Sequence, residues 1–155
     1  MMDFCILGSG IAGSTTANLL SKNYTVEVFD KARGPGGRAS NKRFKSNLCF
    51  DHGAQYISPK NREFKKFIQK LYKKNILKKW DGNHLDFTFQ KKENTLKYIG
   101  KKANNDISKY LLKNIKQNYL SEIINIKYEK KCWKVTLKNK KNYFFKILII
   151  TCPYP

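Results

Sequence analysis

The order of apolar and polar positions predicts an α/β fold that begins with a strand. A short apolar run at 4–7 is followed by glycines, by a segment with helical spacing at 11–22, and by a second apolar run at 24–29. Strand, turn, helix and strand in this order are typical of a βαβ unit with a parallel sheet. The chain therefore starts with the elements of an α/β domain.

The middle of the chain predicts two helices and a hairpin. Residues 59–75 place apolar side chains on one helix face and lysines on the other, which indicates a surface helix packed by its apolar side. Alternation at Leu85, Phe87 and Phe89, and again at 96–100, predicts a hairpin with one covered face. Asn104 or Asn105 is expected to cap a second helix that reaches about Lys116.

The last third predicts three strands, and the polar breaks between them predict turns. Their expected ranges are 120–128, 132–137 and 143–151. The third ends in the continuous apolar run Ile147-Leu148-Ile149-Ile150, which is expected for a strand buried on both faces. The sequence thus favours a parallel central sheet joined to a β-meander.

The first turn carries a G-x-G-x-x-G motif at 8–13. Gly8 permits a tight turn, Gly10 lets a pyrophosphate approach the backbone, and Gly13 lets the helix pack close to the sheet. The helix N-terminus then offers free N–H groups to phosphates. Asp30 follows the second strand, near the spacing at which a carboxylate reaches ribose hydroxyls. Together these features predict dinucleotide binding; the alternative is an ordinary strand-turn-helix unit that binds nothing.

Two later segments extend this prediction. Residues 31–38 contain three glycines and a proline, which exclude regular structure and let Arg38 reach a pyrophosphate. In 49–57, small residues between polar and aromatic ones suggest backbone close to a flat group. Asp51 and His52 are neighbours in sequence and would point to opposite faces of an extended segment. We expect His52 to be a structural, hydrogen-bonded histidine, and we assign no catalytic side chain.

Composition adds a strong positive charge. The 155 residues carry a net charge of +21, which suggests nucleic acid, an anionic membrane or an acidic substrate as partners. The basic residues are nearly all Lys, however, and Arg is preferred for bidentate phosphate recognition. A solvated, Lys-biased surface is therefore favoured over a polyanion site, and a nucleic acid or membrane partner is not expected.

The cysteine and hydropathy patterns do not indicate a metal site or a membrane span. No C-x-x-C pair is present among the four cysteines, and with two histidines a metal site is not expected. Cys5 and Cys152 lie in apolar strand patterns, where a free thiol behaves as a small hydrophobe. No apolar run is long enough to span a bilayer, so the predicted location is the cytoplasm.

Four ordered blocks together resemble a known family. They are G-S-G-I-A-G at 8–13, F-D-K at 29–31, G-G-R at 36–38 and D-H-G-A-Q-Y at 51–56. The sequence resembles the renalase-like FAD-dependent oxidoreductases, within the wider superfamily of amine oxidases and related flavoproteins. The resemblance implies a Rossmann-like FAD/NAD(P)-binding domain with a partial α+β substrate-domain insertion. The implied domains are a discontinuous FAD-binding domain at 1–56 and 100–155 and an insertion at 57–99.

The resemblance also implies the cofactor, FAD, and the residues that contact it. By resemblance these residues are Gly8, Gly10, Ile11, Ala12, Gly13, Asp30, Lys31, Gly37, Arg38, Gln55, Tyr56 and Ile123. The glycine turn would line the pyrophosphate, Asp30 the adenosine ribose and Arg38 the phosphates. Gln55 and Tyr56 would approach the flavin, and Ile123 would meet the adenine through its backbone.

The implied chemistry is hydride transfer from a reduced substrate to FAD. The substrate class is a dihydronicotinamide such as an NAD(P)H-like molecule, or an amine, and O2 is the expected electron acceptor. Members of that family continue well beyond the equivalent of Thr151. We therefore expect a truncated form of the fold, with a second chain as a possible source of the remaining half.

Overall fold

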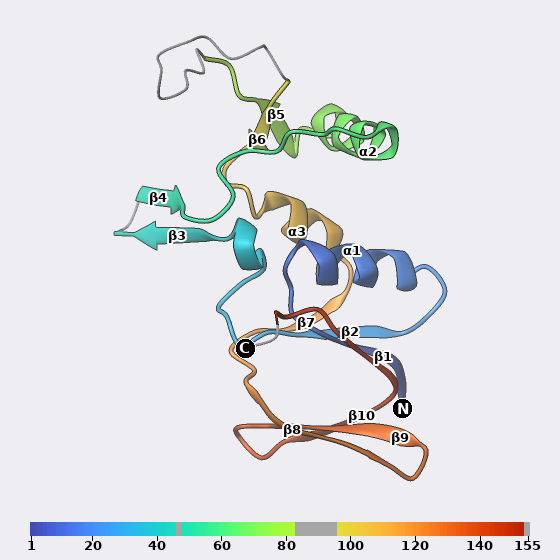
Figure 1. Cartoon of the computed structure of the whole chain (residues 1–155). Coiled ribbons are helices and arrows are strands. Elements are labelled where there is room, and N and C mark those ends of the chain that lie inside the picture. Colours follow the sequence, from blue (N-terminus) through green and yellow to red (C-terminus); the bar gives the residue numbers. More distant parts are fainter. Residues whose placement is uncertain (46–47, 83–95, 154–155) are drawn as a thin grey trace. The chain divides into compact units, whose positions relative to one another are not determined.

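The computed structural model describes residues 1–45, 48–82 and 96–153 (Figure 1). The chain divides into two compact units, and each is described by itself. The first unit contains Met1–Arg38 and Ser108–Pro155, and the second contains Ala39–Ile107. These boundaries differ from 56/57 and 99/100, but compactness does not assign a role to a segment. The assignment of 57–99 to a substrate domain therefore stays a prediction.

The first unit is built on a six-stranded mixed sheet with the strand order β7-β2-β1-β10-β9-β8. Its elements are β1 Met2–Leu7, α1 Ile11–Leu20, β2 Val26–Phe29, β7 Lys116–Asn118, β8 Ile123–Glu129, β9 Cys132–Leu137 and β10 Asn142–Ile150. Strands β7, β2, β1 and β10 are parallel neighbours, and β10, β9 and β8 form an antiparallel meander. The predicted α/β, Rossmann-like fold with a meander is confirmed.

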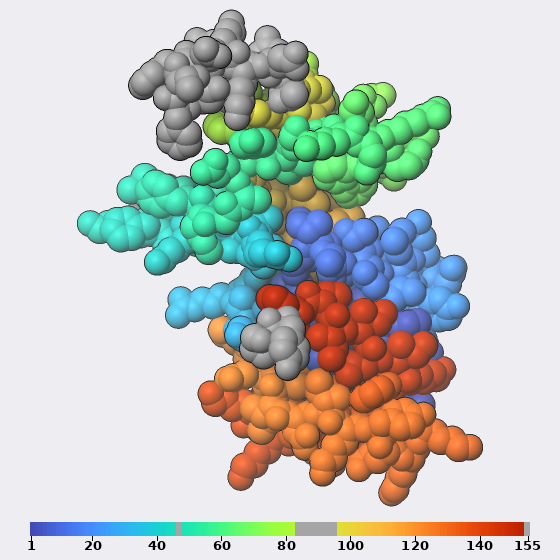
Figure 2. Space-filling model, in the orientation of Figure 1, coloured from blue at the N-terminus to red at the C-terminus, as the bar shows by residue number. Residues whose placement is uncertain are grey.

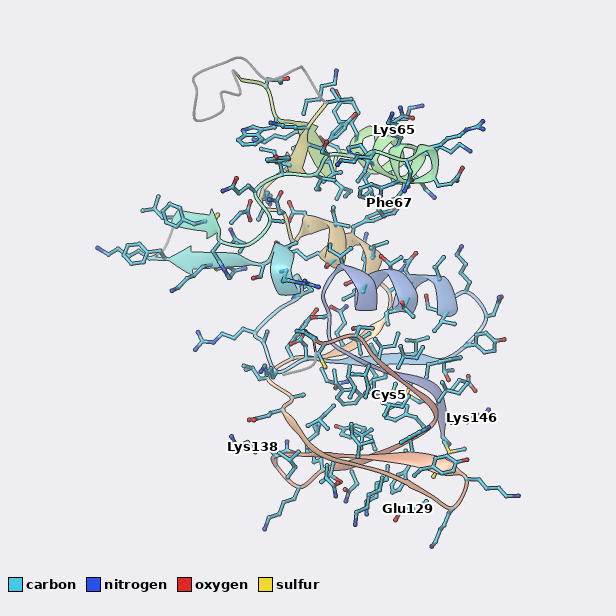
Figure 3. All side chains as sticks on the ribbon, in the orientation of Figure 1. Cys5, Lys65, Phe67, Glu129, Lys138 and Lys146 are labelled. Atoms are coloured by element: carbon cyan, nitrogen blue, oxygen red, sulfur yellow. The ribbon has the colours of Figure 1, made fainter. Side chains whose placement is uncertain are left out.

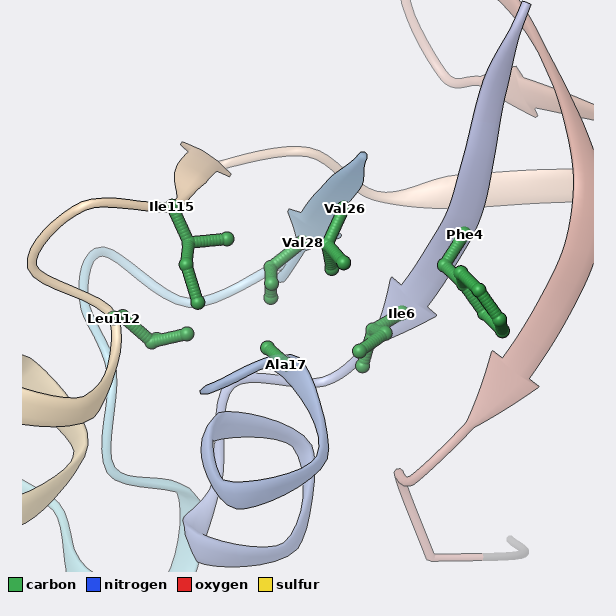
Figure 4. Packing of buried hydrophobic residues seen from close by; sticks show 7 residues of the cluster. All are labelled: Phe4, Ile6, Ala17, Val26, Val28, Leu112 and Ile115. Carbon is green, nitrogen blue, oxygen red and sulfur yellow. The ribbon is translucent and has the colours of Figure 1, made fainter. Parts of the chain in front are cut away.

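A first hydrophobic cluster lies on the face of the sheet that α1 covers (Figure 4). Phe4 and Ile6 from β1 and Val26 and Val28 from β2 point to this face, as the period of two requires. The cluster is completed by Ala17 from α1 and by Leu112 and Ile115 from the segment before β7. These contacts hold α1 against the sheet and so fix where the helix begins.

A second cluster lies on the other face, between the parallel strands and the meander. Cys5, Leu7 and Phe29 pack there against Val135 and Phe145. Phe29 and Phe145 meet edge to face with ring centroids 5.9 Å apart, an arrangement that adds about 0.5–1.5 kcal/mol beyond burial. In Figure 1, β8 and β9 accordingly lie on the opposite side of β1 and β2 from α1.

Strand β10 differs from its sequence-based prediction. Ile147 is 46% exposed and Ile150 is 57% exposed, so the strand is not buried on both faces. In Figure 2 its red surface lies open beside the blue helix of the same unit. The reason is that α1 packs mainly over β1 and β2. The apolar composition of β10 therefore overestimates its burial. Cys152, which follows the strand, is also exposed rather than buried.

The second unit contains two small antiparallel sheets and a basic helix. Its elements are β3 Asn41–Phe44, β4 Leu48–Asp51, α2 Arg62–Lys73, β5 Leu77–Lys79 and β6 Tyr98–Gly100, preceded by the 3-10 turn η1 Gly37–Ala39 and followed by α3 Asp106–Leu111. The Asn61 side chain accepts the N–H of Phe64 and so caps α2. Lys65 and Phe67 lie on opposite sides of this helix, as its amphipathic pattern predicts (Figure 3).

One prediction about the second unit changes, and another lies partly outside the described residues. Strand β6 pairs with β5, while the stretch that contains Leu85, Phe87 and Phe89 lies outside the described residues. Helix α3 ends at Leu111 rather than near Lys116, because the chain turns at Leu112 and enters β7. The Asn104 amide does not cap it: Oδ1 accepts the N–H of Gly100, and Nδ2 donates to the carbonyls of Ala54 and Gln55. No described helix is long and apolar enough to cross a membrane.

Candidate dinucleotide-binding site

The candidate site lies where the parallel strands of the first unit end. Because β1, β2 and β10 run in the same direction, Gly8, Asp30 and Thr151 follow them at one edge of the sheet. Strand β1 is central, with β2 on one side and β10 on the other. Ligands of open α/β sheets bind outside the carboxyl ends of the strands, where the chain changes its direction of winding. The G-x-G-x-x-G turn occupies that position.

The fold itself requires two glycines of this turn. Gly8 has φ +102°, which side chains rarely adopt. A Cβ on Gly13 would collide with the Gly8 carbonyl and would lie 2.7 Å from Thr151 Oγ1. Gly13 therefore lets α1 start directly against the turn, as the sequence predicts. The first turn of α1 has no acidic residue, and Gly10 provides no side-chain cap.

The glycine-rich segment after β2 folds back onto this turn. Gly36 donates its N–H to the Ser9 carbonyl at 3.0 Å and forms a parallel bridge with Gly10. Gly37 has φ +54°, and a Cβ there would lie 3.0 Å from the Cα of Gly10. The two glycine segments, 8–13 and 34–37, thus lie in contact. The sequence predicts that both meet one ligand, but not that they touch each other.

Asp30 connects the end of β2 to the turn after β1. Its Oδ2 accepts both the N–H of Ser9, at 2.7 Å, and the Ser9 hydroxyl, at 2.5 Å. Its Oδ1 accepts the N–H of Ala32 at 2.9 Å. The carboxylate therefore lies at the strand edge, where the sequence places it. Burial raises the pKa of Tyr119 to about 12, and the charge of Asp30 contributes to this increase.

A hollow of about 590 Å³ lies beside Asp30. It is lined by Lys31, Leu120, Ser121, Glu122, Leu137, Lys138 and Asn139. Its wall is fixed to the strand edge, because Ser121 donates its N–H to the Asp30 carbonyl at 2.9 Å. Lys138 pairs with Glu122 at 2.8 Å, so the charge of one of the two lysines that line the hollow is balanced. Ile123 follows this wall directly and packs its side chain into the second hydrophobic cluster.

Apart from Ile123, which is described above, the predicted contact residues fall into three groups. Gly8, Gly10, Gly13, Asp30 and Gly37 come together as described above. Ile11, Ala12, Lys31 and Arg38 are exposed on the same unit. Gln55 and Tyr56 are exposed residues of the second unit, so their approach to a flavin stays a prediction.

Tyr56 belongs to an aromatic and cationic cluster within the second unit. Its ring centroid lies 5.3 Å from that of Trp80, and Lys97 Nζ lies 4.6 Å from the Tyr56 centroid. The preceding residues are fixed by Asn104, which is buried and donates to Ala54 and Gln55. The D-H-G-A-Q-Y block is therefore positioned by a buried amide, which the sequence analysis gave as one of two alternative helix caps.

Ser9 and Thr151 are the residues that the sequence analysis missed. Thr151 Oγ1 lies 2.9 Å from the Leu7 carbonyl and 3.2 Å from that of Gly8, so it joins the end of β10 to the turn. Its position directly after an apolar strand was the available signal. Ser9 carried no signal beyond its place between two glycines.

The other polar candidates have structural partners. His52 Nε2 lies 3.0 Å from the Ser40 hydroxyl, while Asp51 Oδ1 accepts the N–H of Asn104. The predicted hydrogen bond of His52 is confirmed, while its assignment as a structural rather than a catalytic residue stays a prediction. Burial raises the pKa of the Cys5 thiol, which favours its neutral, apolar form. Within the described residues, no group of His, Cys, Asp and Glu is placed to hold a metal ion.

Comparisons with known proteins agree with the Rossmann-like fold. Residues 6–71 match the family model of the NAD(P)-binding Rossmann-like domain, a type of domain found in FAD-dependent oxidoreductases. The uncharacterized protein MJ1450 of Methanocaldococcus jannaschii is 35% identical over 57 residues. That stretch is 37% of this chain and 15% of the relative.

Two solved structures have a similar fold over 97% of this chain. The tetracycline destructase Tet(51) has 13% sequence identity and a TM-score of 0.62, and the chain covers 38% of it. The Diels-Alderase PyrE3 of pyrroindomycin biosynthesis has 11% identity and a TM-score of 0.61, and the chain covers 32% of it. The chain thus spans well under half the length of these relatives, and the likeness concerns the fold.

Proposed function

We propose that the first unit binds FAD and belongs to an FAD-dependent oxidoreductase of the renalase and amine-oxidase type. The observation that carries the proposal is the contact between two glycine segments at the carboxyl edge of a parallel sheet. Backbone N–H groups and a helix N-terminus at such an edge form a binding surface for a pyrophosphate. The match of residues 6–71 to a dinucleotide-binding family supports it.

Gly10 adds a second argument for a ligand. Its φ is −67°, and a Cβ there would make only ordinary contacts, 3.7 Å from the Cα of Gly37. Neither conformation nor protein packing therefore demands glycine at this position. Close approach of a ligand phosphate gives a reason for glycine there.

The adenosine half of FAD would lie between Asp30 and the neighbouring hollow. A carboxylate at the end of the second strand accepts ribose hydroxyls and disfavours a 2′-phosphate through charge repulsion. We therefore propose a dinucleotide with an unphosphorylated adenosine ribose, as in FAD. Ile123 directly follows Glu122 of the hollow's lining and would offer its backbone to the adenine, while Lys31 lines the same hollow.

When bound, FAD would supply hydride-transfer chemistry toward a reduced substrate, and O2 is the electron acceptor that we propose. The substrate class we propose is a dihydronicotinamide, such as an NAD(P)H-like molecule, or an amine. The role of this chain is to bind and orient the dinucleotide, since the flavin supplies the redox chemistry. Gln55 and Tyr56 are proposed to face the flavin, and a second chain is proposed to supply the remaining substrate contacts.

The proposal is tested with the purified full chain and excess FAD. We expect flavin absorbance to remain with the protein after gel filtration, and the unfolding midpoint to rise with FAD concentration. A ligand that binds only the folded state at 100 times its dissociation constant stabilises it by about 2.7 kcal/mol. Colourless protein with an unchanged midpoint would exclude FAD binding. Riboflavin is the matched control ligand, because it lacks the pyrophosphate and the adenosine.

A basic polyanion-binding module is the second candidate function. The observation that favours it is α2, whose exposed face carries Lys65, Lys66, Lys70 and Lys73. Glu63 balances one of these charges through Lys66 at 3.1 Å. The candidate predicts retention on heparin up to high salt concentrations, since phosphate contacts release counterions. Elution at low salt concentrations would exclude it.

A further inference from the structure

Ser9 is buried between Gly8 and Gly10, with an exposed fraction of 0%. Its hydroxyl donates to Oδ2 of Asp30 at 2.5 Å, and its backbone N–H donates to the same oxygen at 2.7 Å. The other oxygen, Oδ1, accepts the N–H of Ala32 at 2.9 Å. One residue therefore supplies two of the three hydrogen bonds that hold this carboxylate.

Ser9 is itself held from two further directions. Its carbonyl accepts the Ser14 hydroxyl of α1 at 3.1 Å and the N–H of Gly36 at 3.0 Å. Four hydrogen bonds thus connect Ser9 to the end of β2, to the first turns of α1 and to the second glycine segment. This arrangement fixes Oδ2 of Asp30, because neither the donors nor the carboxylate can turn without breaking several bonds at once.

The number of acceptor sites then limits what Asp30 can do. A carboxylate has about four lone-pair sites, two on each oxygen. The described hydrogen bonds use both sites of Oδ2 and one site of Oδ1. An adenosine ribose offers two neighbouring hydroxyls, but Asp30 has room to accept one of them.

We infer that Ser9 is a positioning residue that determines ribose specificity, because it occupies Oδ2 and leaves Asp30 to accept a single ribose hydroxyl at Oδ1. The inference rests on the proposed function, since it concerns the adenosine half of the dinucleotide. The site then discriminates strongly against loss of one ribose hydroxyl and tolerates loss of the other. A carboxylate free at both oxygens would accept both hydroxyls.

The test measures displacement of FAD by three competitors, ADP, 2′-deoxy-ADP and 3′-deoxy-ADP, from the full chain. With the wild type, we expect one deoxy compound to bind about 10–150 times more weakly than ADP, the range for a hydrogen bond to a charged group. The other should bind within about twofold of ADP. In Ser9→Ala, the second compound should also lose affinity relative to ADP, because Oδ2 can now accept the second hydroxyl.

Ser14→Ala is the matched control. It removes a hydroxyl bonded to the Ser9 carbonyl but leaves every bond to Asp30, so it should keep the wild-type ratios. A merely structural role for Ser9 would weaken all three competitors in Ser9→Ala by one common factor, and this result would overturn the inference. Equal losses for both deoxy compounds on the wild type would overturn it as well, even if Ser9→Ala failed to fold. If neither FAD nor ADP binds the wild type, the proposed function fails and the inference falls with it.

Discussion

Gly10 is the glycine of the motif that the fold does not require, so a bound ligand is the reason we propose for it. Its neighbours in the motif are glycine for internal reasons, since Gly8 has a positive φ and Gly13 approaches the Gly8 carbonyl. Gly10 has an ordinary φ and space for a methyl group. Substitution by alanine should therefore have different consequences at Gly10 and at Gly13.

We predict that Gly10→Ala folds but binds FAD poorly. Replacing glycine by alanine at a helix N-cap costs about 1 kcal/mol or less of stability. A methyl group in the path of the pyrophosphate should raise the FAD dissociation constant at least about tenfold, or about 1.4 kcal/mol. Urea unfolding and FAD titration measure the two effects separately.

Gly13→Ala is the comparison for that experiment. Its methyl group would collide with the Gly8 backbone, so we expect a clear loss of stability even without ligand. Equal FAD affinity in Gly10→Ala and in the wild type would contradict the assignment of this turn to phosphate binding.

Arg38 is predicted to contribute a charged contact to the phosphates. It is exposed at the end of the second glycine segment, directly after Gly37. Arg38→Ala should weaken FAD binding by about 1.5–3 kcal/mol, the range for a hydrogen bond to a charged group. Arg33→Ala is the control, because Arg33 is an exposed arginine of the same loop. The FAD dissociation constants of the two variants, measured by isothermal titration, should therefore differ. Equal FAD affinities would refute a phosphate contact of Arg38.

At the scale of elements, hydrophobic periodicity predicted several strands and helices close to their observed bounds. The predicted range 132–137 is the observed β9, and α1 and α2 lie within their predicted ranges. Periodicity succeeds there because each of these elements buries one face. For β10 the predicted burial of both faces was wrong, because burial depends on which element covers the strand, and α1 covers β1 and β2 instead.

The site shows the same limit. The glycine motif and Asp30 could be found from spacing, because strand, turn and helix are consecutive in sequence. The bonds of Ser9 to Asp30 and of Thr151 to Leu7 join residues that are far apart along the chain. The role of Asn104, one of the two residues predicted to cap the second helix, was missed for this reason too, since its partners Ala54 and Gln55 come from a distant segment. Such partners follow only from the assembled sheet and loops.

Asp3 links the first strand to the last and gives a pH-dependent prediction. Its carboxylate accepts hydrogen bonds from Lys146 at 2.7 Å and from the hydroxyl and N–H of Thr25. The bond from Lys146 is the largest cause that holds the pKa of Asp3 well below its ordinary value of 3.8. This stabilisation is therefore complete above about pH 5, and it is lost as the pH falls through and below 3.8.

We expect Asp3→Asn to be less stable than the wild type at pH 7. The difference should shrink as the pH falls from about 5 to about 2, because the wild type loses the benefit of its charged carboxylate. Urea unfolding at a series of pH values measures it. Lys146→Gln removes the largest cause of the pKa shift and should show part of the same effect. A difference that stays constant with pH would refute this account.

At the scale of the whole molecule, charge is the dominant property. A net charge of +21 on 155 residues opposes compaction through mutual repulsion. The described ion pairs are few and mostly exposed, such as Lys138 with Glu122, so they offset little of this repulsion. Buried Glu27 is the exception, because it pairs with Lys116 at 2.9 Å inside the sheet of the first unit.

We predict that salt stabilises this protein. The Debye length falls from about 30 Å at 0.01 M to about 8 Å at 0.15 M, so repulsion between separated lysines is screened while short hydrogen bonds persist. A gain of about 1 kcal/mol corresponds to a rise of about 2–4 °C in the unfolding midpoint for a chain of this size. Differential scanning calorimetry in increasing NaCl checks it, and Lys65→Gln should reduce the dependence slightly. A midpoint that falls with salt would show instead that favourable ion pairs outweigh the repulsion.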